Sequence, residues 1–111
     1  MKNIFPEPIR NLPQADIPID GLKAYLSQAA DHQLVLMQFE KEVDLPEHSH
    51  AAQVGFILSG VMELTIGGVK RQYGKGDIYY IPAGVKLSGR FHAGYSDITF
   101  LGESDRYKTR R

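Results

Sequence analysis

The chain has 111 residues, with 13 basic and 13 acidic side chains and a formal net charge of zero. A neutral chain of this length fits one domain, and its charge argues against nucleic acid or an anionic membrane as the main partner. It contains no cysteine, which excludes disulfides, thiolate zinc sites and cysteine nucleophiles and leaves histidine, carboxylate, amide and tyrosine groups for chemistry.

The first segment, residues 1–19, is rich in proline and is predicted to be an extended arm. Its prolines are Pro6, Pro8, Pro13 and Pro18, and proline fixes φ and removes a backbone donor, which disfavours a long helix. Such an arm can lie across its own domain or add an edge strand to a partner, so a homodimer is the expected assembly. The segment lacks the apolar stretch of a signal peptide, and no run is long enough to span a membrane, so we expect a cytoplasmic protein.

After the arm, the sequence reads as short strands separated by turns. Residues 22–27 alternate apolar and polar side chains but also fit a helical face; we favour a strand because QLVLMQF at 33–39 suits a hairpin partner. Further along, MELTI precedes Gly67 and Gly68, a two-residue hairpin signal, and later turns bound IYYIP. Roughly eight to ten strands with frequent turns are typical of an all-β sandwich or barrel.

The strand pattern ends near residue 104, so the barrel domain is predicted over residues 20–104. The remaining residues, 105–111, read DRYKTRR and are basic. A short basic tail binds nucleic acid only in a favourable context, and we expect this one to be solvated.

A pair of histidines, His48 and His50, stands between Pro46 and the apolar run VGFILSG. On a strand, residues i and i+2 share a face, so the two imidazoles would aim at one point, as a metal site requires. The pattern alone leaves three alternatives open: a working metal site, an emptied one, or two surface histidines. Ser49 would face the opposite side of the strand, so no Ser-His nucleophile is predicted.

This stretch resembles the first motif of the cupin family, which contains His-x-His, then a Glu, then a Gly after six further residues. His48, His50 and Gly60 fit the motif in identity. Counting back across six residues from Gly60 places Gln53 in the Glu position.

The second cupin motif is also present in its spacing, Gly-x5-Pro-x-Gly, at Gly76, Pro82 and Gly84. Together the two motifs make the resemblance cover most of residues 33–101. It implies an all-β fold, the cupin double-stranded β-helix or jelly-roll barrel. The chain also looks like small single-domain cupins that end near Asp-Arg-Tyr-Lys, here residues 105–108.

The departures from the family pattern concern the metal. In cupins the two His, the Glu and a final His of the second motif hold one divalent ion; here Leu87 stands in the final position and Gln53 in the Glu position. The resemblance therefore implies a weakened site of His48, His50 and Gln53, able to hold Zn, Ni, Fe, Mn or Cu with reduced affinity. His92 lies five residues beyond Leu87, on the opposite strand face, so we expect it at the surface.

Two classes of function remain open. One is a metal-dependent enzyme in which the ion acts as a Lewis acid or oxygen-activating centre on a small organic molecule. The other is a non-catalytic binding or sensing module with a vestigial metal site. We favour a small cupin that binds a small molecule in its barrel at a weak or vestigial metal site. Tyr79 and Tyr80 alternate in facing, so one of them can reach the pocket, although aromatic side chains on barrel strands are more often core.

Overall fold

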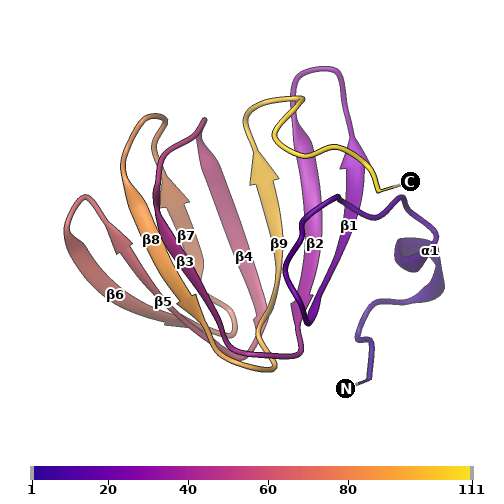
Figure 1. Cartoon of the computed structure of the whole chain (residues 1–111), viewed down its shortest axis with the longest axis horizontal. Coiled ribbons are helices and arrows are strands. Elements are labelled where there is room, and N and C mark those ends of the chain that lie inside the picture. The colour runs from indigo at the N-terminus through magenta and orange to yellow at the C-terminus, as the bar shows by residue number, and fades with distance from the viewer. Residues whose placement is uncertain (1, 111) are drawn as a thin grey trace.

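Figure 1 shows a computed structural model that describes residues 2–110 as two antiparallel sheets around one core. The strands are β1 (Leu22–Gln28), β2 (Gln33–Phe39), β3 (Val43–His48), β4 (Gln53–Ser59), β5 (Val61–Ile66), β6 (Val69–Gly74), β7 (Ile78–Ile81), β8 (Leu87–Phe91) and β9 (Ser96–Leu101). One sheet has the order β1-β2-β9-β4-β7 and the other β3-β8-β5-β6. The predicted all-β class, including a strand rather than a helix at the start of the domain, is confirmed.

The chain crosses between the sheets at almost every connection. Only two hairpins, β1–β2 and β5–β6, join neighbours within one sheet among the described residues, and each of the other connections changes sheet. The β5–β6 hairpin turns at Gly67 and Gly68, whose φ angles of 55° and 84° are those that a tight two-residue hairpin demands and glycine adopts readily. This repeated crossing wraps both sheets around the same interior, which is the jelly-roll arrangement.

An aromatic cluster fills one end of the interior. The rings of Phe39 and Phe91 stack with centroids 4.4 Å apart, and the ring of Tyr95 lies 5.8 Å from the first and 5.0 Å from the second. Phe91 pairs with Val43 at the end of the β3–β8 ladder opposite the pair formed by His48 and Leu87. The aromatic rings therefore close the end of the barrel that lies away from the histidines.

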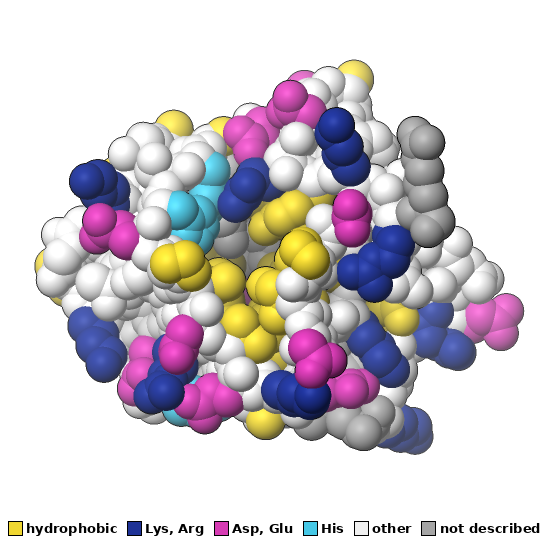
Figure 2. Space-filling model, in the orientation of Figure 1, with side chains coloured by type: hydrophobic (Ala, Val, Ile, Leu, Met, Phe, Trp, Pro, Cys, Tyr) yellow, Lys and Arg dark blue, Asp and Glu magenta, His cyan; other side chains and the backbone are white. Residues whose placement is uncertain are grey.

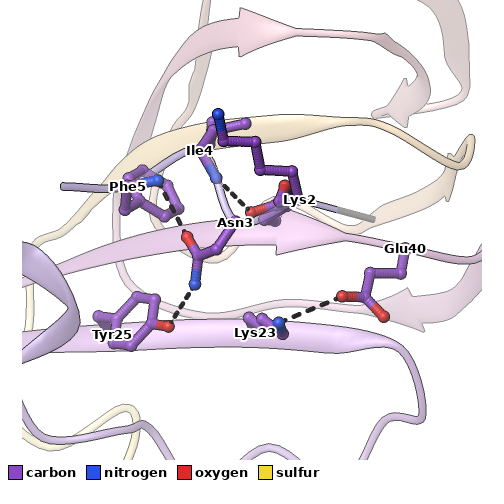
Figure 3. Close-up of polar contacts among 8 residues, drawn as sticks. Lys2, Asn3, Ile4, Phe5, Lys23, Tyr25 and Glu40 are labelled. Atoms are coloured by element: carbon purple, nitrogen blue, oxygen red, sulfur yellow. Dashed lines mark hydrogen bonds and ion pairs between the residues drawn. The ribbon is translucent and has the colours of Figure 1, made fainter. Parts of the chain in front are cut away.

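The first part of the N-terminal arm, which includes the short helix α1 (Glu7–Arg10), lies on the outer face of the five-stranded sheet (Figures 1 and 3). Asn3 Nδ2 donates to the Tyr25 hydroxyl over 2.7 Å, and the Ile4 backbone N–H donates to Gln38 Oε1 over 3.0 Å. The Phe5 ring packs edge-on against Tyr25 with centroids 5.9 Å apart. The arm thus takes one of its two expected placements, across its own domain.

The backbone of the C-terminal tail pairs with the arm, whereas the side chains of Lys108, Thr109 and Arg110 are exposed, so the expectation of a solvated tail holds for these side chains and not for the backbone. The Lys108 carbonyl accepts from the Asp16 N–H over 2.7 Å, and the Arg110 N–H donates to the Gln14 carbonyl over 2.7 Å. Tyr107 packs against the main core. Burying this aromatic ring and satisfying these backbone groups holds the tail against the domain.

The ends of both segments, Met1 and Arg111, lie outside the described residues. No helix within residues 2–110 is long and apolar enough to cross a membrane. The cytoplasmic location stays a prediction.

Replacing Phe5 with Ala tests the packing of the arm. Phe5 is 5% exposed, so the variant should lose about 3 kcal/mol of unfolding free energy, in line with truncation of buried aromatic side chains. Its neighbour Ile4 is 47% exposed, and Ile4→Ala should change stability by less than about 0.5 kcal/mol. Urea denaturation measures both, and equal small losses would show that the arm is not packed on the sheet.

Candidate functional site

A cavity of about 60 Å³ lies between the sheets. This volume suits a few water molecules or a small ligand, since one water needs roughly 10–15 Å³ of such space. Its wall is mostly apolar, and its polar groups are those of His48, His50, Gln53, Tyr79 and Tyr107. Figure 2 shows a hollow in this face, with hydrophobic side chains at its floor and histidine side chains at one side.

Both end segments of the chain contribute to the cavity wall. The arm supplies Ile17 and Ile19, and the tail supplies Tyr107. The pairing of tail with arm therefore completes the site, rather than merely tethering the chain ends.

The two histidines line the cavity together, but not because they share a strand. His48 is the last residue of β3, whereas His50 lies in the loop before β4. The prediction of His-x-His on one strand is wrong because β8 begins at Leu87, the partner of His48, and offers no ladder position for residue 50. The ring centroids are nevertheless 5.3 Å apart.

Backbone carbonyls determine which ring nitrogen of each histidine carries the proton. His48 Nδ1 lies 2.8 Å from the carbonyl oxygen of Pro46, and His50 Nδ1 lies 2.6 Å from that of Ala51. A carbonyl oxygen only accepts, so each Nδ1 is the donor and each neutral ring keeps its lone pair on Nε2. Burial lowers the pKa of His50 below its usual value, which favours the neutral ring. Metal-binding histidines are oriented in this way.

The remaining predicted site positions are placed as the spacing implied. Gln53 is the first residue of β4 and lines the cavity. Leu87 is 4% exposed, lines the cavity and pairs directly with His48 across the β3–β8 ladder. Within residues 2–110, no group of three or more His, Cys, Asp or Glu side chains could hold a metal ion. The cavity wall offers two imidazoles and one amide, ligand types that would hold a divalent transition metal only weakly.

The other histidines lie away from the cavity. His92 follows β8, is 39% exposed, and its Nδ1 lies 3.8 Å from a carboxylate oxygen of Glu42. The prediction that His92 is a surface residue is confirmed. His32 stands in the β1–β2 turn and stacks on Phe100 with centroids 5.1 Å apart.

Sequence reasoning missed a group of polar residues on the inner face of the five-stranded sheet. Tyr79 faces inward and Tyr80, 59% exposed, faces outward, which settles which tyrosine reaches the cavity. The Tyr79 hydroxyl accepts from Gln53 Nε2 over 2.9 Å and lies 3.5 Å from Thr99 Oγ1. The available signal was the alternation in SDITFL, which places Asp97 and Thr99 on the same strand face as Leu101.

Asp97 is a carboxyl group in the core, with a relative exposure of 0%. It accepts from the Tyr95 hydroxyl over 2.5 Å and from Thr99 Oγ1 over 2.9 Å. None of the ion pairs found within residues 2–110 includes it. Burial raises the pKa of Asp97 to about 7, because two hydroxyl donors offset only part of the lost hydration.

Asp97→Asn tests this burial through the pH dependence of stability. The folded protein keeps a proton that the unfolded chain releases near pH 3.8, so unfolding free energy should fall as pH rises from about 4 to about 7. The fall attributable to this group is at most roughly 4 kcal/mol. Asp97→Asn should remove it, while other titrating groups cancel in the comparison. Chemical denaturation at pH 4.5 and 7.5 measures the difference between the two proteins; a pH-independent difference would contradict the burial of an ionisable group.

Solved structures share this architecture. A search of curated protein sequences finds no match. An RmlC-like cupin from Shewanella frigidimarina superposes with a TM-score of 0.74 at 20% identity, covering 85% of this chain and 86% of that one. KdgF from Halomonas sp. gives a TM-score of 0.69 at 20% identity, covering 82% and 87%. At these identities the likeness establishes the fold.

A larger enzyme matches over part of its length. Oxalate decarboxylase from Bacillus subtilis, described with Mn(II) centres, gives a TM-score of 0.73 at 17% identity, covering 87% of this chain and 29% of that one. The family model for the cupin domain matches residues 35–92, just over half of the sequence. The predicted jelly-roll barrel is confirmed, and the chain belongs to the cupin family.

Proposed function

We propose that this cupin binds a small molecule in the cavity between its sheets, at a weak divalent-metal site formed by His48 Nε2, His50 Nε2 and Gln53 Oε1. The observation that carries the proposal is the pair of Nδ1 contacts with backbone carbonyls, which leaves both Nε2 lone pairs available. The Mn(II) centres described for oxalate decarboxylase are consistent with an ion in a barrel of this fold.

The residues of this chain supply the environment for such an ion. A bound divalent ion would polarise an oxygen atom of the ligand as a Lewis acid. Leu87, beside His48 in the ladder, makes the wall apolar at this point and limits access of water. The small volume restricts the ligand, or the part of it that enters, to a few non-hydrogen atoms.

The alternative is a non-catalytic binding module whose metal site is vestigial. Leu87 and the lack of a carboxylate ligand favour it, because a neutral set of two imidazoles and one amide holds a cation less well. Arg106 adds a donor nearby: its buried Nε has no hydrogen-bond partner within residues 2–110, and its guanidinium lies 5.0 Å from the ring centre of Tyr107. A ligand that raises the melting temperature without being consumed would favour this alternative, whereas turnover abolished by His48→Ala would reject it.

Metal titration of protein prepared without a histidine tag tests the site. We expect wild-type protein to bind Ni²⁺ or Zn²⁺ weakly by calorimetry, and His48→Ala to abolish binding. Leu87→His places a third imidazole directly across the ladder from His48 and should tighten binding at least about tenfold. His92→Ala, which alters a surface histidine, is the matched control and should change nothing. Absence of uptake by the wild-type protein, or no gain from Leu87→His, would contradict the proposed site.

We also propose that a second copy of this chain covers an apolar surface on β4 and β7. The outward side chains Phe56, Leu58, Ile78 and Tyr80 are 42%, 36%, 62% and 59% exposed. The outward positions of these two strands carry no charge, and β7 is an edge strand of its sheet. An uncharged face beside an open edge can pair with its own copy about a two-fold axis without charge repulsion.

Ile78→Lys tests this homodimer. A lysine at the centre of an apolar contact must lose hydration, so the variant should be monomeric at concentrations where the wild-type protein is dimeric. Light scattering coupled to size-exclusion chromatography measures the mass. Ile4→Lys changes an exposed apolar residue on the arm and should leave the dimer intact. A wild-type protein that is monomeric at millimolar concentration would contradict the proposal.

A further inference from the structure

A glycine allows side chains from three neighbouring strands to meet. In the ladders, Gly55 on β4 pairs with Tyr79 on β7 and with Thr99 on β9. A Cβ atom at Gly55 would lie 1.9 Å from Cε2 of Tyr79 and 2.6 Å from its hydroxyl oxygen. The Tyr79 ring therefore lies over the bare glycine, and its hydroxyl reaches both Gln53 and Thr99, at 2.9 and 3.5 Å.

Asp97, Thr99, Tyr79 and Gln53 form a series of hydrogen-bonding contacts that runs from the core to the cavity wall. The direction of each bond in this series follows from Asp97, at its buried end. An ionised Asp97 can only accept, so the single proton of Thr99 is directed at the carboxylate, 2.9 Å away. In the long contact of 3.5 Å between Thr99 Oγ1 and the Tyr79 hydroxyl, Tyr79 is then the only possible donor, and this contact takes its single proton. The Tyr79 oxygen is left as an acceptor, and it receives the amide N–H of Gln53.

The outer end of this series of hydrogen bonds is the Gln53 side chain at the cavity wall. Because Nε2 is held by Tyr79, Oε1 is turned away from the chain of hydroxyls, and it takes part in none of the hydrogen bonds found within residues 2–110. We propose that Asp97 is a positioning residue that acts through Thr99 and Tyr79 to present Gln53 Oε1 to the cavity. Beside Gln53 Oε1, the cavity then binds a cation or a ligand group that donates a hydrogen bond. The inference rests on the proposed function only in taking this cavity as the binding site.

The positioning role of Asp97 differs from a purely structural one because it requires a group at position 97 that only accepts hydrogen bonds. The substitution Asp97→Asn would keep the shape and the hydrogen bond from Tyr95, but the new amide could donate to Thr99 and allow the protons of Thr99 and Tyr79 to turn outward. The Gln53 amide would then present its NH₂ group to the cavity as readily as its oxygen. The other titratable groups near Asp97 are Tyr79, Tyr95 and Tyr107. Burial raises the pKa of each, so all three stay protonated and do not disturb the direction.

The test follows the Gln53 side-chain amide by ¹⁵N NMR at pH 8, above the Asp97 pKa of about 7. In the wild-type protein, hydrogen exchange of this amide should be at least about tenfold slower than in Tyr79→Phe, which removes its acceptor. Asp97→Asn and Thr99→Val should both lose that protection and shift the amide resonance. Thr99→Ser keeps the hydroxyl and should restore the wild-type behaviour, which loss of packing alone would not explain.

Calorimetric titration with Ni²⁺ is the second readout. Asp97→Asn and Thr99→Val should weaken binding about tenfold, as changes of groups behind a metal ligand do, and Thr99→Ser should not. If either variant fails to fold, the other decides. Unchanged Gln53 exchange and resonance position in the folded variants would overturn the positioning role even if Ni²⁺ binds. A wild-type protein that takes up no Ni²⁺ overturns the metal site instead, and the amide readout alone then decides the role of Asp97.

Discussion

The five-stranded sheet buries several polar side chains, and its stability depends on the hydrogen bonds that these side chains make. Gln33, Gln38, Ser96, Asp97 and Thr99 are each at most 1% exposed. A buried polar group without a partner costs about 1–3 kcal/mol, so losing the partner of any one of these side chains would destabilise β2 or β9 by about that amount. The same requirement explains why Tyr79 must reach across Gly55, because its buried hydroxyl finds its partners only there.

Buried polar side chains also hold the arm and the tail, one on each face of the sheet. Gln38 on its outer face accepts the backbone N–H of Ile4 and donates to the carbonyl of Lys2, so the arm satisfies a buried amide. At the other end of β2, Gln33 bonds both backbone groups of Tyr107. Buried amides of one strand thus hold the arm and the tail, and the tail in turn places the Tyr107 ring in the cavity wall. The site is therefore built partly by segments that lie outside the strands of the barrel.

Much of the fold was predictable from local signals. The glycines at 67 and 68 and the alternation in residues 22–27 predicted a hairpin and a strand. The resemblance of the two motifs to the cupin family implied the wrapping of the sheets. The resemblance to the cupin motif pointed to His48, His50 and Gln53, and all three line the cavity, although His50 is on a loop and not on a strand. The spacing of residues in the sequence does not show where the pairing of two strands ends. Strand β3 ends at His48 because its partner strand β8 begins at Leu87. The packing of the tail against the domain escaped prediction because composition described its charges and not the partly buried ring of Tyr107.

The hydrogen-bonded series of Asp97, Thr99 and Tyr79 behind Gln53 escaped prediction for a different reason. It is made by residues from β4, β7 and β9 that meet only when the ladders are in register, and its key member is a glycine with no side chain. Once the register is known, the amide at position 53 has a physical explanation. The Tyr79 oxygen needs a donor, which Gln supplies and an ionised Glu does not. A carboxylate at 53 would also place a second acidic group near Asp97 in a poorly hydrated interior, raising the free-energy cost of ionising either. The departure from the family motif at Gln53 is therefore coupled to Asp97, a residue outside both motifs.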